Sequence, residues 1–157
     1  MAKKEEFWLK DGNNIHSVCQ KAIYTYGAEH QKIKAIEELG ELIESMMLSV
    51  QNDVTNVEEE IADVEIMMCQ LRKMYQVDPV IFEVVEGGLN SDKMYLIIEL
   101  SKLVQAIPRS LIGDNHTVET QIINVERAIN TIRTMFNMTL INEIKIQKLE
   151  RLAGNVW

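Results

Sequence analysis

Apolar side chains recur three and four residues apart along most of the chain, and glycine, proline and Asn-Asp turns break this pattern into segments. That spacing gathers apolar side chains on one face of an α-helix. No segment alternates apolar and polar residues as a half-buried strand does, so the predicted fold class is all-α. The pattern predicts helices over about residues 14–27, 28–51, 55–75, 78–87, 90–112, 117–136 and 139–154.

Residue types at the segment ends predict where several helices begin. Thr55 and Glu58 have the spacing of a capping box, in which each side chain bonds the backbone of the other residue. Asp78 followed by proline predicts a short linking helix over residues 78–87. Thr139 is expected to cap the last helix.

An internal repeat organises the chain, because a shift of 61 residues superposes residues 33–77 on residues 94–138 without a gap. Each copy predicts the same helical hairpin. One hairpin cannot bury its apolar face alone, so the two copies are expected to pack as a four-helix bundle, a pseudo-dimer within one polypeptide. Chance similarity between amphipathic helices is the alternative, but the turn and capping residues align as well. Identical pairs include Ile36/Ile97, Glu38/Glu99, Leu39/Leu100, Leu42/Leu103, Val57/Val118, Glu65/Glu126 and Arg72/Arg133.

Length and composition favour a single domain over residues 1–157, because 46% of the residues are hydrophobic and suffice for one core. Within it we expect a metal-binding repeat 1 at about residues 28–77 and a degenerate repeat 2 at about residues 90–138. A C-terminal helix over residues 139–153 follows, and additional N-terminal and linking helices complete the bundle.

Charge narrows the classes of partner. The net charge of −8 at pH 7 argues against nucleic acid polymers and anionic membranes, which bind concentrated cationic patches. No apolar run approaches the roughly 20 residues of a membrane span, and the charged start of the chain is unlike a signal peptide. We therefore expect a cytoplasmic protein, in which Cys19 and Cys69 are reduced, buried thiols.

Four acidic residues form the most informative chemical pattern. Glu38 and Glu41 lie three residues apart in one predicted helix, and Glu60 and Asp63 repeat the spacing in the next, so each pair leaves one helix face. Carboxylates about 4 Å apart repel by roughly 4 kcal/mol near a protein surface, and a cation has to offset this. Oxygen ligands favour Mg²⁺, with Mn²⁺ as a substitute. A solvated acidic face is the alternative, but Ser45 rather than lysine follows Glu41 by four residues, so the usual ion pair is missing.

The pattern Glu37-Glu38-x-x-Glu41, followed by Glu60-x-x-Asp63, resembles the EExxE/ExxD signature of the all-α NTP pyrophosphohydrolases, the MazG-like superfamily. Residues 21–27, 59–67 and 148–152 also resemble short MazG-like proteins, and the likeness covers about residues 15–153. The resemblance implies Mg²⁺-dependent hydrolysis of a (deoxy)nucleoside triphosphate to the monophosphate and pyrophosphate by a metal-activated water. It assigns the catalytic and metal-binding roles to Glu38, Glu41, Glu60 and Asp63, with Glu37 as an additional acid.

The second copy departs from this signature. Ile98, Lys102, Gln121 and Asn124 stand where the first copy has Glu37, Glu41, Glu60 and Asp63, and Glu99 alone remains. One degenerate copy also resembles the all-α dUTPase branch, in which one polypeptide supplies a whole bundle and a single site. We therefore expect one active site per repeat pair, in a monomeric pseudo-dimer or a homodimer of such chains.

Candidate substrate contacts lie outside the acidic pattern. Lys148 and Arg151 are candidate cations for the triphosphate, and Gln31 lies near where family members contact substrate; ordinary surface roles are the alternative for all three. Phe7 and Trp8 could stack on a base, although docking of this segment on the bundle is favoured. The alternative function is a catalytically inactive MazG-like module that binds a nucleotide or a protein. Base and sugar preference do not follow from these residues.

Overall fold

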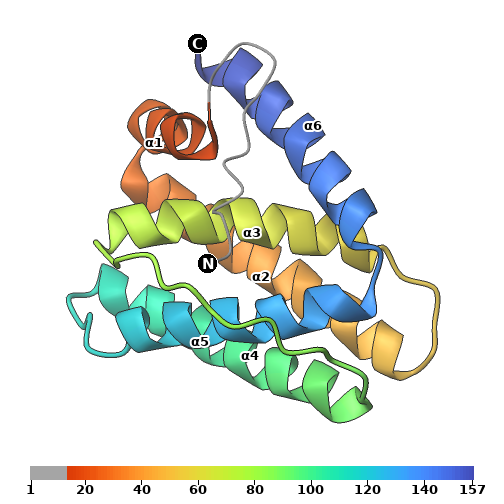
Figure 1. Ribbon diagram of the computed structural model, residues 1–157. Helices are drawn as coiled ribbons and strands as arrows, with labels where there is room; N and C mark the ends of the chain where they lie inside the picture. Colours follow the sequence, from red (N-terminus) through yellow and green to blue (C-terminus); the bar gives the residue numbers. More distant parts are fainter. Residues whose placement is uncertain (1–13) are drawn as a thin grey trace.

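The computed structural model describes residues 14–157, and helices make up most of this range (Figure 1). The predicted all-α class is confirmed for these residues. Phe7 and Trp8 lie outside the described part of the chain. The helices are α1 (Ile15–Tyr26), α2 (Ala28–Val50), α3 (Val57–Met74), α4 (Asn90–Leu111), α5 (Val118–Ile132), the 3-10 helix η1 (Arg133–Met135) and α6 (Met138–Val156).

Short polar turns separate the first helices. The Asn14 side chain accepts a hydrogen bond from the backbone N–H of Ser17 at 3.0 Å and caps α1. Gly27 then separates α1 from α2 with φ of 91°. This conformation is unfavourable for any residue that has a Cβ atom, and glycine has none. Helix α1 packs on α3 and α6.

The capping box predicted at Thr55 and Glu58 is not formed. Helix α3 begins at Val57, and the Thr55 hydroxyl donates instead to the backbone carbonyl of Ser45 at 3.3 Å. The hydroxyls of Thr55 and Ser45 also contact one another. The Thr55 hydroxyl therefore bonds across the α2–α3 turn instead of capping α3. A threonine hydroxyl can form hydrogen bonds with more than one nearby backbone group, so both arrangements are open to it.

The predicted cap of the last helix was displaced by two residues. Asn137 precedes α6, and its side chain accepts a hydrogen bond from the backbone N–H of Leu140 at 3.0 Å. Thr139 lies inside the first turn. Asparagine caps helices at least as well as threonine, and it stands where the 3-10 turn ends.

The predicted linking helix over residues 78–87 was wrong. Residues 77–88, which we call the strap, are extended and run along α5 (Figure 1). The Asn130 side chain donates to the Glu83 carbonyl at 3.2 Å, and the Gly87 N–H donates to the Thr134 hydroxyl at 2.8 Å. A ten-residue helix is marginal alone, and here side chains of α5 and η1 bond backbone groups of the strap instead.

Two helical hairpins occur at the positions that the repeat predicts. Shifting α3 by 61 residues takes Val57 to Val118 and Met74 to Met135, which are the first residue of α5 and the last of η1. Helix α2 packs on α3 and α4, α4 packs on α5, and α3 also contacts α5 and α6. The shared core contains matched pairs of fully buried side chains: Leu39 and Leu100, Leu42 and Leu103, Ile61 and Ile122.

Two ion pairs cross between the hairpins. Arg72 of α3 pairs through two nitrogens with Glu126 of α5. Arg133 of η1 pairs with Glu65 of α3, with 2.7 Å between Nε and Oε1. These pairs are equivalent under the shift, because Arg72 corresponds to Arg133 and Glu65 to Glu126.

None of the helices within residues 14–157 combines the length and apolar character that crossing a membrane requires.

Candidate metal centre

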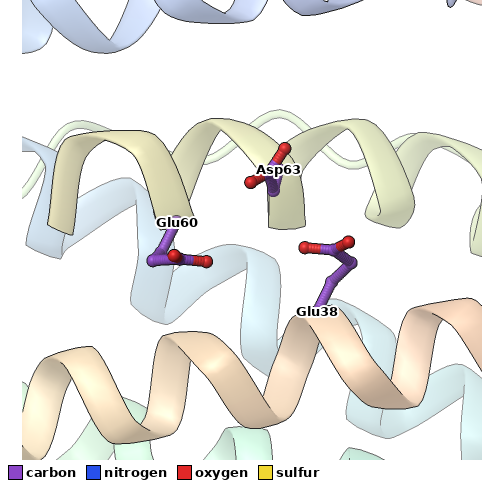
Figure 2. Close-up of side chains that lie close together, drawn as sticks. All are labelled: Glu38, Glu60 and Asp63. Atoms are coloured by element: carbon purple, nitrogen blue, oxygen red, sulfur yellow. The ribbon is translucent and has the colours of Figure 1, made fainter. Parts of the chain in front are cut away.

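Three carboxylates converge between α2 and α3 (Figure 2). Glu38 extends from α2, and Glu60 and Asp63 extend from successive turns of α3. One carboxylate oxygen of each residue lies within 4.8 Å of those of the other two. The spacing of three residues puts Glu60 and Asp63 on one side of α3, and the α2–α3 turn brings that side against Glu38.

Glu38 is held with one oxygen paired and the other unpaired. Its Oε1 lies 3.2 Å from the Lys34 ammonium nitrogen, one turn earlier in α2. Its Oε2 is buried without a hydrogen-bond partner among the described residues. Burial and the neighbouring charge of Asp63 raise the pKa of Glu38, and Lys34 only partly opposes this.

Glu60 is the most deeply buried of the three, with 9% of its surface exposed. The Asn56 side chain donates to Oε1 at 2.8 Å, whereas Oε2 is buried and accepts no hydrogen bond from residues 14–157. Burial raises the pKa of Glu60 to about 7, and the negative charges of Glu41, Asp63 and Glu38 add to the rise while Asn56 opposes it.

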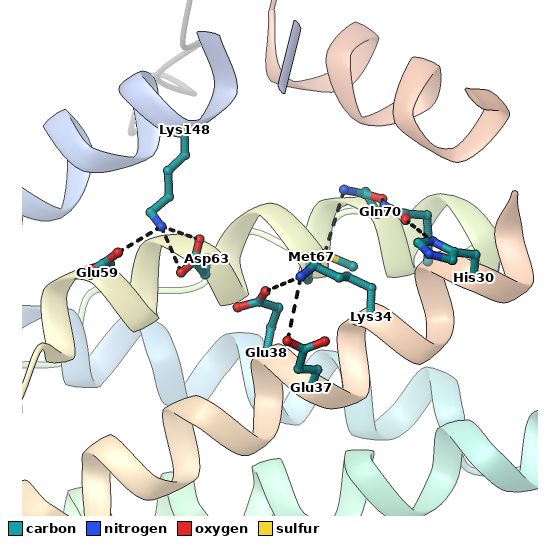
Figure 3. Close-up of polar contacts among 10 residues, drawn as sticks. His30, Lys34, Glu37, Glu38, Glu59, Asp63, Met67, Gln70 and Lys148 are labelled. Atoms are coloured by element: carbon teal, nitrogen blue, oxygen red, sulfur yellow. Dashed lines mark hydrogen bonds and ion pairs between the residues drawn. The ribbon is translucent and has the colours of Figure 1, made fainter. Parts of the chain in front are cut away.

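Asp63 already has a cationic partner. The Lys148 ammonium of α6 lies 2.8 Å from Oδ1 and 3.0 Å from Oδ2, and it also reaches Glu59 at 3.3 Å (Figure 3). Burial lowers the pKa of Lys148, but its hydrogen bonds and attraction to Asp63 and Glu59 outweigh this and raise the pKa overall. Helix α6 thus supplies a positive charge to one edge of the cluster.

The other two predicted acids lie at the margin. Glu41 is exposed and is outside the three-carboxylate cluster, although its charge contributes to the raised pKa of Glu60. Glu37 is exposed, and its carboxylate lies 3.9 Å from the Lys34 nitrogen. Of the predicted ligands, Glu38, Glu60 and Asp63 are therefore together, and Glu41 is nearby.

The three carboxylates could hold a metal ion. Glu38 and Glu60 each bury an oxygen without a partner among the described side chains, and both carboxyl groups have raised pKa values. Both observations indicate that the described residues compensate the negative charge of Glu38 and Glu60 only in part. An ion held by these oxygens would supply the rest, and an all-oxygen donor set favours hard cations such as Mg²⁺.

A cavity of about 430 Å³ opens beside the cluster. Glu38 and Asp63 line one part of it, and the predicted substrate contacts Gln31, Lys148 and Arg151 line others. Gln31 is buried and donates from Nε2 to Oε1 of Gln70 at 2.7 Å. The cavity therefore joins acidic, cationic and amide groups in one space.

Sequence reasoning missed three residues of this site. Lys34 could have been found, since it precedes Glu38 by four residues and such pairs meet on a helix. Asn56 precedes Glu60 by four residues at the start of α3, yet it bonds that side chain rather than capping the helix. Gln70 had no signal in the sequence, because its partner Gln31 lies 39 residues away.

The second hairpin has different side chains at the positions that match the three-carboxylate cluster. Glu99 is buried, with Oε1 3.1 Å from the Lys102 nitrogen and Oε2 without a partner in the described range. Gln121 also buries an unpaired side-chain oxygen, and Asn124 accepts a hydrogen bond from Arg127 at 3.2 Å. Amides and a lysine have thus replaced three carboxylates, which removes most of the negative charge.

Comparison of the chain with protein-family models, with curated proteins and with solved structures finds no match.

Proposed function

We propose that the chain is a Mg²⁺-dependent nucleoside triphosphate pyrophosphohydrolase, which converts a (d)NTP to the (d)NMP and pyrophosphate. The observation that carries the proposal is the convergence of Glu38, Glu60 and Asp63 beside a cavity that also has cations in its wall. A triphosphate needs both features, because its oxygens bind Mg²⁺ and also require positively charged side chains.

Within this proposal, Glu38, Glu60 and Asp63 would hold the ion, and Glu41 would add negative charge from the edge. A bound Mg²⁺ or Mn²⁺ would supply neutralisation of phosphate charge and a more acidic water. Glu60 would lose its proton on loading, since a carboxyl with a pKa of about 7 binds a cation only in its ionised form.

Lys148 could interact either with the carboxylates of α3 or with a bound triphosphate. Without an ion it neutralises Asp63 and Glu59. With a divalent ion on Asp63, the like charges would repel, and Lys148 would turn to the triphosphate oxygens. Arg151 lies one turn further along α6 and lines the same cavity, so both side chains could bind one polyphosphate.

We further propose that the bundle is a fused dimer with one active site, formed by repeat 1 and completed by repeat 2 and α6. The crossed pairs Arg72–Glu126 and Arg133–Glu65 support this, since equivalent residues exchange partners across a two-fold dimer interface. The second hairpin has no matching site, because Lys102, Gln121 and Asn124 stand where the first hairpin has carboxylates.

A catalytically inactive module that binds a nucleotide or a protein is the second candidate. The Lys148–Asp63 pair favours it, because an internal ammonium already compensates one of the three carboxylates. Such a module would bind ligand in the 430 Å³ cavity without cleaving it.

The test is incubation of the chain with a panel of NTPs and dNTPs in Mg²⁺, with separate assays for pyrophosphate and orthophosphate. We expect pyrophosphate, and a loss of about 100-fold or more in the Glu38→Gln variant, because a charged ligand is removed. Glu99→Gln is the matched control, since Glu99 is also buried, lysine-paired and left with one unpaired oxygen. Its activity should stay within a few-fold of the unmodified chain.

Two results would contradict the proposed pyrophosphohydrolase activity. One is orthophosphate as the product, and the other is equal activity of Glu38→Gln and Glu99→Gln. Nucleotide binding without turnover in Mg²⁺ and Mn²⁺ would establish the inactive module instead.

A further inference from the structure

A second and larger cavity, of about 560 Å³, lies on a different face of α3 from the carboxylate cluster. Cys69 and His16 line it, together with cationic side chains that include Arg72, Arg133 and Lys145. None of the candidate metal ligands belongs to its wall, so the proposed hydrolase does not use this space.

Both cysteine thiols of the chain belong to or pack against one small apolar cluster, and one of them lines this cavity. Cys19 of α1 is fully buried, and its sulfur lies 3.8 Å from the Ile66 carbonyl oxygen in α3. Cys69 of α3 packs against the same small apolar cluster and is half-buried. Both are free, and only Cys69 lines the cavity.

The surroundings make the two thiols unequal. A hydrogen bond from Cys19 lowers the pKa of Cys69, and His16, whose Nδ1 lies 3.9 Å from the Cys69 sulfur, lowers it further with Lys73. The pKa of Cys19 is raised, because it holds the shared proton beside a thiolate and is buried. Cys69 is therefore the nucleophile of the pair, and Cys19 is its protonated neighbour.

We propose that Cys69 is a site of oxidation by small hydroperoxides and that Cys19 resolves the product into a disulfide joining α1 to α3. The cavity admits the peroxide to Cys69, whereas full burial of Cys19 prevents the reverse order. His16, whose Nδ1 lies 3.9 Å from the Cys69 sulfur, and Lys73, one turn further along α3, favour the negatively charged sulfur that the reaction needs.

The chemistry balances in two steps. The Cys69 thiolate attacks one peroxide oxygen, so that an S–O bond forms and the O–O bond breaks. The leaving alkoxide, or hydroxide from hydrogen peroxide, takes a proton from solvent to become an alcohol or water. The sulfur is oxidised by two electrons and the peroxide is reduced. Cys19 then attacks the sulfenic sulfur of Cys69, the S–S bond forms, and the S–O bond breaks with release of water, which takes the Cys19 proton.

The direct test uses the full unmodified chain, treated with one equivalent of hydrogen peroxide and then with an alkylating reagent in denaturant. We expect both thiols to disappear together, and intact mass to show an intramolecular disulfide that a reducing agent reverses. Two alkylatable thiols after this treatment, or disulfide-linked dimers in place of the internal bond, would overturn the proposal.

Variants separate the roles of the two sulfurs. Cys19→Ser should stop at a sulfenic acid on Cys69, which dimedone traps, and Cys69→Ser should leave Cys19 unmodified under the same peroxide. Equal oxidation of Cys19 in the Cys69→Ser chain would contradict the order. Circular dichroism should be used to check that each variant folds, and the test on the unmodified chain does not depend on the variants.

The pH dependence of alkylation gives an independent readout. Four groups interact with the charge of Cys69: Cys19 and His16 on α1, Lys73 on α3 and Glu126 on α5. Other charged side chains line the same cavity: Glu65, Arg72, Asp78, Arg133 and Lys145. At pH 7 we expect Cys69 to react about 10-fold or more faster than Cys19, and His16→Ala to move the pH midpoint of Cys69 upward. Equal rates for the two thiols would refute the assignment of Cys69 as the nucleophile. Neither readout depends on nucleotide hydrolysis.

Discussion

Among single residues, Glu60 has the charge state that most affects the candidate metal centre. Its ordinary pKa of 4.5 rises to about 7 in the folded chain, mainly through burial. Between these values the folded state therefore holds more protons than the unfolded state. The free energy of unfolding of the metal-free chain should then fall as pH rises through this window.

We expect Glu60→Gln to raise the free energy of unfolding of the metal-free chain at pH 8 by about 1–3 kcal/mol, since a neutral amide needs no proton. Gln121 occupies the matching position in the second hairpin, so the shape is already tolerated there. Urea unfolding in EDTA at pH 5 to 8 measures the effect. The exposed Glu44→Gln change should leave the pH slope as it is, and a similar slope for both variants would argue against a raised pKa at Glu60.

At this scale the sequence predicted part of the site. The spacing of Glu60 and Asp63 indicated one helix face, and the structure brings both to Glu38. Spacing could not tell how far α2 is rotated toward α3, and for that reason Glu41 was grouped with residues it only neighbours. The Gln31–Gln70 contact depends on the packing of two helices, so no local pattern could show it.

Among the elements, the strap depends on close approach to α5 and η1. A Cβ atom on Gly87 would lie 2.8 Å from Cγ and Sδ of Met135 and 3.1 Å from the Thr131 carbonyl oxygen. Gly88 would meet nothing within 4 Å. The two glycines therefore form a matched pair for substitution.

Gly87→Ala should lower the free energy of unfolding by about 1–3 kcal/mol, because the strap must move away from a backbone oxygen that cannot yield. It should also expose the strap to limited proteolysis by weakening the bond from the Gly87 N–H to Thr134. Gly88→Ala should change neither measurement appreciably. Equal protease sensitivity of the two variants would contradict this account.

The crossed ion pairs make a second test at this scale. Arg72→Ala leaves Glu126 half-buried without its guanidinium, and we expect a loss of about 2–3 kcal/mol in the free energy of unfolding. Glu126→Ala should cost a similar amount, and the double variant should cost clearly less than the sum. Denaturant unfolding of the unmodified chain, the two single variants and the double variant gives the coupling free energy of the pair. If the losses of the single variants simply add, the ion pair contributes no stability.

The fold was predictable where repeated apolar patterns specify packing, as in α2–α3 and α4–α5. It was not predictable in residues 78–87, where Asp78-Pro79 and Gly87 marked the ends of a segment correctly but not its conformation. Hydrogen bonds from Asn130 and to Thr134 stabilise the extended form. Those partners lie 47 residues away, beyond the reach of local helix propensity.

For the whole molecule, a divalent ion that bridges α2 and α3 should stabilise the entire fold, because it binds the folded state alone. At a Mg²⁺ concentration about 100 times its dissociation constant, we expect a gain of about 2.7 kcal/mol in the free energy of unfolding. Thermal unfolding with increasing Mg²⁺ measures it. The gain should be lost in Glu38→Gln and kept in Glu99→Gln, and a gain of the same size in both variants would indicate nonspecific ion binding.

The strap packs along α5, whereas α6 packs on α3, so the two hairpins have different neighbours however closely their sequences agree. In a symmetric dimer of two identical chains, both hairpins have the same neighbours, and every substitution occurs in both copies. A single polypeptide that contains both hairpins has no such constraint. Lys148 lies beside Asp63, whereas Asn124, the matching residue of the second hairpin, accepts a hydrogen bond from Arg127. Substitutions can therefore change one hairpin without changing the other.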